Sequence, residues 1–119
     1  MKMEKYWLEN IYNTIKGFSN FDRQRAAWRG LNKNVVSSYI EDYNLLFFSF
    51  DFEDFITTWK NEKHDNAILI ELIEFNDMLT NYDNSISEEM KLDDIRILED
   101  PNWLTVVSHA KRIVEMWKP

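Results

Sequence analysis

Apolar residues recur along most of this chain every three or four positions, which is the spacing of one face of an α-helix. In the first half of the chain this pattern predicts four helices, at residues 3–18, 20–30, 34–47 and 51–63. Residues 44–50 suit a short strand as well as a buried helix, because periodicity alone does not separate the two. Asp51 is expected to cap the fourth helix, and Glu53 and Asp54 follow it in the first turn, where negative charge favours the helix dipole.

A longer helix is predicted from Asp65 or Asn66 to about Thr80. Its apolar side is expected to be buried and comprises Ile68, Leu69, Leu72, Ile73, Phe75, Met78 and Leu79. The acidic residues on its other side, Glu71, Glu74 and Asp77, are expected to face solvent. Residues 82–85 then predict a turn, after which Ser85 or Ser87 caps a short helix and residues 93–98 add another helical turn.

The strongest boundary signal is Asp100-Pro101, an N-cap followed by proline at the first helical position, where the missing N–H costs nothing. The helix that follows has an apolar face that includes Trp103, Leu104, Val107 and Val114, and Trp103 is expected to be a core anchor. The whole chain contains only two glycines and two prolines, too few for a turn-rich β fold. We therefore expect one compact all-α domain, residues 1–119, with about six to eight helices.

Negative charge is concentrated in the middle of the sequence. Residues 41–100 contain 17 acidic and four basic side chains, a balance of −13, whereas the whole chain has a net charge of −7. Such a field attracts a cationic partner and repels nucleic acid and anionic lipid. The alternative is that acidic helix surfaces serve only solubility.

Motifs for catalysis are largely absent. The two glycines are too far apart for a phosphate-binding loop, and the chain has no cysteine. His64 lies in a polar run and His109 on the polar flank of the last helix, so neither is expected to be catalytic. Glu71 and Glu74 have the i, i+3 spacing of carboxylates that bind metal in helical bundles, but the accompanying Glu-x-x-His is missing. We therefore expect no enzyme activity, no metal and no cofactor.

Five tryptophans are many for 119 residues, and four of them fall on the predicted apolar faces. Trp28, between Arg25 and Arg29, is the one expected to be partly exposed. The N-terminal residues have no apolar segment of signal-peptide length, and the longest apolar run, residues 45–48, is far too short to span a bilayer. The expected location is the cytoplasm, without membrane association.

Three segments resemble the small immunity proteins of bacterial contact-dependent growth inhibition and related polymorphic toxin systems. These segments are Phe50-Asp51-Phe52-Glu53-Asp54-Phe55, Glu71-Leu72-Ile73-Glu74-Phe75-Asn76-Asp77, and the run from Leu98 through Asp100-Pro101-Asn102-Trp103 to Val107. The similarity covers about the C-terminal 70 residues and consists of helix starts and apolar positions. It implies a cytoplasmic protein that binds and neutralises one toxin domain, commonly a cationic nuclease.

The resemblance assigns no binding residue, so charge alone selects the expected contacts with such a toxin. They lie on the long helix and in the segment after it: Glu71, Glu74, Asp77, Asp83, Glu88, Glu89, Asp93 and Asp94. Asp51, Glu53 and Asp54 are set aside, because capping and dipole roles account for them. Two other functions stay open: a metal-assisted hydrolase that uses helix carboxylates, and a helical adaptor subunit of another assembly.

Overall fold

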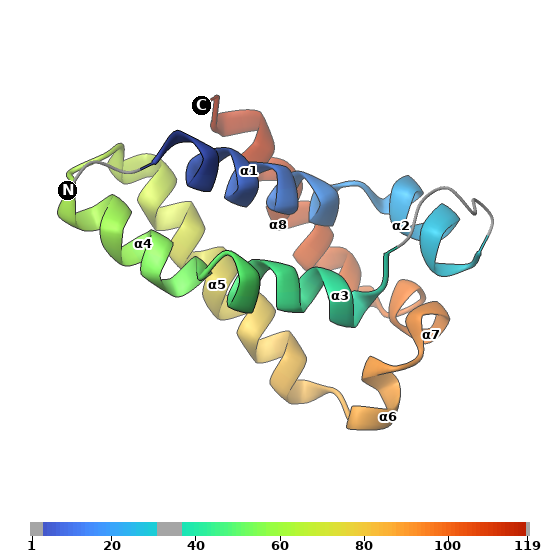
Figure 1. Ribbon diagram of the computed structural model, residues 1–119. Coiled ribbons are helices and arrows are strands. Elements are labelled where there is room, and N and C mark those ends of the chain that lie inside the picture. Colours follow the sequence, from blue (N-terminus) through green and yellow to red (C-terminus); the bar gives the residue numbers. More distant parts are fainter. Residues whose placement is uncertain (1–3, 31–36, 119) are drawn as a thin grey trace.

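The computed structural model describes residues 4–30 and 37–118, and every regular element in these two ranges is a helix (Figure 1). The elements in order are α1 (Lys5–Ser19), α2 (Phe21–Trp28), α3 (Tyr39–Asn44), the π-helix η1 (Leu45–Ser49), α4 (Phe52–Asn61), α5 (Asn66–Ser85), α6 (Glu88–Lys91), α7 (Asp94–Leu98) and α8 (Pro101–Met116). The expectation of an all-α bundle of six to eight helices is confirmed. No helix in the described ranges has the length and apolar character needed to cross a membrane.

The bundle is organised around the two longest helices. Helix α8 packs between α1 and α5, and α4 folds back along α5 (Figure 1). The short helices α6 and α7 carry the chain from the end of α5 to the start of α8. Helix α3 and η1 both contact α1, and η1, which also contacts α4, leads directly into α4.

Side-chain caps fix most helix starts, as the sequence predicts. The Asn20 side chain accepts a hydrogen bond from the Arg23 N–H, Asp65 accepts from the N–H groups of Ala67 and Ile68, and Ser87 accepts from Met90. Asp93 and Asp100 cap α7 and α8 in the same way. The N-cap residues of α1 and η1, Glu4 and Asn44, make no such bond, and neither does Asp51, which the sequence predicts as a cap. Asp51 occupies the N-cap position of α4, and its φ is +48°.

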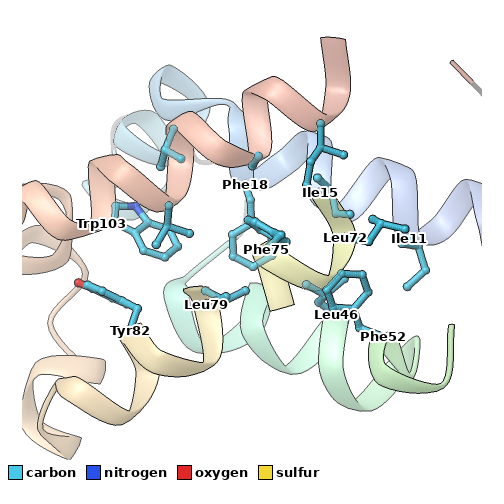
Figure 2. Packing of buried hydrophobic residues seen from close by; sticks show 14 of the residues in the cluster. Ile11, Ile15, Phe18, Leu46, Phe52, Leu72, Phe75, Leu79, Tyr82 and Trp103 are labelled. Atoms are coloured by element: carbon cyan, nitrogen blue, oxygen red, sulfur yellow. The ribbon is translucent and has the colours of Figure 1, made fainter. Parts of the chain in front are cut away.

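The core is rich in aromatic side chains, several of which gather around Trp103 at one end of the cluster in Figure 2. This fully buried indole has four rings with centroids 5.3 to 6.0 Å away, from Phe18, Trp28, Tyr39 and Tyr82. The four rings come from α1, α2, α3 and α5, so the Trp103 side chain joins its own helix, α8, to four others. The expectation that Trp103 is a core anchor is confirmed, whereas Trp28 is buried rather than partly exposed.

Several local predictions differ from the structure. Residues 82–85 continue α5 instead of turning, because the Tyr82 ring is buried against Trp103. Ile73 and Leu104 are exposed by 39 and 41 % although both lie in apolar runs. The third helix begins at Tyr39, and residues 34–36 of its predicted range lie outside the described residues. For residues 45–49 the sequence left a short strand and a helix open, and the structure shows a π-helix.

Candidate partner-binding surface

The eight acidic residues predicted to contact a partner do not form a single face. Helix α5 packs against α8, and near its C-terminal end Tyr39 of α3 contacts Tyr82 and Asp83. Glu71 contacts α8, whereas Asp83 contacts α3. The row of carboxylates that the sequence places together is therefore divided between two sides of the helix.

Glu71 is buried, so the expectation that it faces solvent is wrong. Its Oε1 lies 2.9 Å from Nη2 of Arg112, and its Oε2 lies 3.3 Å from Nε2 of His109. Both partners come from α8, which covers this side of α5. Charge–charge contact with Arg112 offsets part of the cost of removing the Glu71 carboxylate from water.

Asp83 and Asp94 hold Tyr39 in place at the start of α3. The Tyr39 hydroxyl donates a 2.7 Å hydrogen bond to Asp83, and the Tyr39 backbone N–H donates one of 3.1 Å to Asp94. Burial raises the pKa of Asp94, and the hydrogen bond from Tyr39 opposes that rise. These two carboxylates are occupied within the fold, so they are poorly placed for a partner.

The other five predicted residues are accessible. Glu74, Asp77 and Glu89 are exposed and form no ion pair within the described ranges. Glu88 is exposed and lies 2.8 Å from Nζ of Lys91, and Asp93 is exposed while it caps α7. These five carboxylates stay available as predicted contacts.

A groove at the junction of η1 and α4 combines exposed aromatic and acidic side chains. It has a volume of about 230 Å³ and is lined by Tyr43, Phe47, Phe48, Asp51, Glu53 and Asp54, which we call the acidic groove. The Phe48 side chain is 71 % exposed, and the side chains of Asp51, Glu53 and Asp54 are exposed as well. No described basic residue forms an ion pair with any of these three carboxylates.

The π-helix creates this arrangement. The Phe50 N–H donates to the Leu45 carbonyl at 3.0 Å, a five-residue step that widens the turn. Leu46 is then fully buried while Leu45 and Phe48 face outward. Short π-helices occur frequently at functional sites. The sequence predicts that Asp51 caps a helix, which was the ground for excluding it as a partner contact. Because its side chain makes no capping hydrogen bond, that ground is removed.

Tyr43 connects the acidic groove with the far end of α5. Burial raises the pKa of the Tyr43 hydroxyl, the negative charges of Asp83 and Glu53 raise it further, and Lys91 opposes them. The charges of both carboxylates therefore act on one phenol that lines the acidic groove.

A larger hollow, of about 670 Å³, lies between the start of α1 and α4. It shares Asp51 with the acidic groove, and Glu4 and Glu62 also line it, together with the rings of Tyr6 and Trp7. Both depressions beside Asp51 therefore combine carboxylates with aromatic rings, a composition suited to cationic groups.

No family model, no curated protein and no solved structure matches this chain.

Proposed function

We propose that this chain is an immunity protein that binds a cationic toxin domain and blocks its substrate cleft through the acidic groove. The observation that supports this most is the groove that Asp51, Glu53 and Asp54 line together with the exposed ring of Phe48, since none of the three carboxylates forms an ion pair with a described residue. The resemblance of three segments to immunity proteins points in the same direction. Neither the groove nor the resemblance requires the chain to have a catalytic residue.

The chemistry of the groove favours arginine and lysine side chains of a protein. A guanidinium group binds carboxylates through paired hydrogen bonds and stacks on aromatic rings. A groove of about 230 Å³ has room for a side chain or two, and an exposed aromatic ring beside it supplies the apolar anchor that protein interfaces use. A nuclease cleft offers the complementary surface, because it is cationic in order to bind phosphates.

The remaining exposed acids extend this negative field. Glu74, Asp77, Glu88, Glu89 and Asp93 would guide the approach of a cationic domain even where they do not touch it. Charge steering of this kind raises association rates by about one to three orders of magnitude and weakens with salt. The bound acidic protein then excludes the nucleic acid by occupying its site.

The proposal expects a gene for a toxin-like domain directly upstream of the gene for this chain, and the absence of such a gene would count against it. The binding test uses the domain that this gene encodes. Co-expression should restore growth of cells that make the toxin domain, and association measured at low and high salt should slow as salt rises. Growth that is not restored despite binding would favour the adaptor function. Absence of any binding to that domain would reject the proposal.

Two double variants with the same change in charge locate the contact. Glu53→Lys with Asp54→Lys alters the acidic groove, and Glu74→Lys with Asp77→Lys alters α5. We expect the Glu53/Asp54 double variant to abolish protection of cells against the toxin. We expect the Glu74/Asp77 double variant only to slow association with the toxin domain. The reverse result would place the docking face on α5, and full protection by both double variants would exclude docking through either acidic face.

A further inference from the structure

Three side chains that ligate metals in other proteins meet where α5 packs on α8. They are Glu71, Glu74 and His109, and their potential ligand atoms all lie within 4.8 Å of one another. We propose that they bind a divalent first-row transition ion, with Zn²⁺ as the representative ion. The site is separate from the acidic groove and does not depend on the proposed function.

The Oε2 atom of Glu71 points to a missing ligand. The Glu71 side chain is only 7 % exposed. Its Oε2 is buried and accepts no hydrogen bond from the described residues, and it lies 3.3 Å from Nε2 of His109, a contact that is an ion pair only when that ring is protonated. Arg112 holds the other oxygen, Oε1, at 2.9 Å, which fixes the orientation of the carboxylate. Oε2 is thereby directed at the His109 ring. Buried carboxylate oxygens are rarely left unsatisfied, because the desolvation cost is not recovered.

The spacing fits a tetrahedral ion. Oε2 of Glu71 and Nε2 of His109 are 3.3 Å apart. Zinc–nitrogen and zinc–oxygen bonds of about 2.0–2.2 Å at a tetrahedral angle put two ligand atoms about 3.4 Å apart. An ion can therefore sit between these two atoms without a shift of either helix.

The ligands combine rigidity with access. The His109 ring is 10 % exposed and stacks on Phe75 at a centroid distance of 6.1 Å, which limits its rotation. Glu74 is exposed, so its carboxylate can turn toward the ion from one helical turn beyond Glu71. Three protein ligands leave one tetrahedral position open for water. Arg112 takes the role of the outer partner that orients a ligating carboxylate.

One imidazole and two carboxylates select among metals. Magnesium and calcium prefer sites built from oxygen alone, whereas imidazole suits zinc and its neighbours in the first row. The sequence argument against metal relied on the missing Glu-x-x-His motif within one helix. The structure supplies the histidine from a second helix, 38 residues further along the chain.

A metal-free explanation of the same contact exists and makes a different prediction. His109 Nε2 is also 3.3 Å from the Glu71 carbonyl oxygen, to which a neutral ring could donate its N–H. In that case the three residues form a polar contact between α5 and α8 and have no affinity for an ion.

Titration of the untagged chain with ZnSO₄ by calorimetry, and with CoCl₂ by visible absorption, separates these explanations. We expect one equivalent of each ion to bind, with cobalt giving the intense bands of tetrahedral coordination. Glu74→Gln should weaken zinc binding by about tenfold or more, since it removes a ligand at an exposed position. Asp77→Asn, an exposed carboxylate further along the same helix, is the matched control and should bind as the unaltered chain does.

Ring proton signals in the NMR spectrum provide a readout without mutation. Zinc should shift or broaden the signals of His109 and leave those of His64 unchanged. Three results would overturn the proposal: no saturable zinc binding, equal affinities for Glu74→Gln and Asp77→Asn, or a response at His64 alone. Toxin binding can be measured in the presence of a chelator, so failure of either proposal is recognised separately.

Discussion

The indole Nε1 of Trp103 donates a 2.9 Å hydrogen bond to Oε1 of Gln24, a residue 79 positions away, and both side chains are fully buried. The amide nitrogen of Gln24 in turn donates to the carbonyls of Gly17 and Phe18, at 3.1 and 2.8 Å. One glutamine thus joins the end of α1 to α2 and α8. Since each polar atom has a partner, the burial of Gln24 carries little desolvation penalty.

Trp103→Ala should reduce the free energy of unfolding by about 3–5 kcal/mol, a large share of a domain total of about 5–15 kcal/mol. The loss comes from the cavity and from the unsatisfied oxygen of Gln24. Urea denaturation followed by far-UV circular dichroism measures it. Leu104→Ala is the control, since that neighbouring side chain is largely exposed and should cost far less. Equal losses for the two variants would contradict a core role of Trp103.

The stability of the protein should fall steeply above pH 10. Burial raises the pKa of Tyr39 from its ordinary value of 10.0, and the hydrogen bond to Asp83 raises it further. Burial and the hydrogen bond to Asp100 likewise raise the pKa of Tyr82. Above pH 10 the unfolded chain loses these protons while the folded chain keeps them, so the stabilisation present below pH 10 is lost as the pH rises.

Each of these tyrosines contributes a slope of about 1.4 kcal/mol per pH unit above pH 10. Tyr39→Phe should remove one such contribution. Urea denaturation at a series of pH values between 8 and 11.5 gives the slope for both proteins. An unchanged slope in Tyr39→Phe would show that this hydroxyl does not keep its proton in the folded state.

Arg112→Ala should destabilise the fold although Arg112 is 63 % exposed. The variant leaves the buried Glu71 carboxylate without its charged partner in α8. A buried polar group that loses its partner costs about 1–3 kcal/mol. Thermal unfolding at neutral pH measures the effect. Lys111→Ala, at the adjacent exposed position, should change stability by no more than about 0.5 kcal/mol. If the two variants unfold alike, Arg112 does not stabilise Glu71.

Phe48→Ala should leave stability nearly unchanged and weaken toxin binding. The ring is 71 % exposed, so truncation removes little packing, but loss of an aromatic anchor at an interface costs about 2 kcal/mol or more, roughly a 30-fold change in Kd. Calorimetric titration with the toxin domain gives the Kd. Leu92→Ala, a similarly exposed apolar residue between α6 and α7, serves as the control. Equal affinities for both variants would exclude Phe48 as an anchor.

Helix positions could be predicted from the sequence because their signals are local. The caps Asn20, Asp65 and Asp100 each bind N–H groups two or three residues away, so residue type and spacing are enough to identify them. The apolar period likewise identifies Trp103 as buried, because a single face of its helix carries the large side chains.

The features that the sequence did not reveal depend on contacts between distant segments. Glu71 reads as a solvent-facing acid until α8 places Arg112 and His109 against it. Tyr82 reads as part of a turn until Trp103 packs on its ring. The acidic groove was missed for a related reason: Asp51 has the residue type and position of a cap, and only its backbone conformation shows that it does not act as one.

The five residues of η1 also bear on how this surface can change in evolution. A π-turn holds one residue more than an α-turn, so deletion of a single residue from Leu45–Ser49 would restore ordinary helical winding. The residues on one side of the deletion would then rotate by about 100° relative to those on the other. Phe48 would leave its present place beside Asp51 without any substitution. A change in chain length at this junction would therefore alter the groove even if the residues that line it stayed the same.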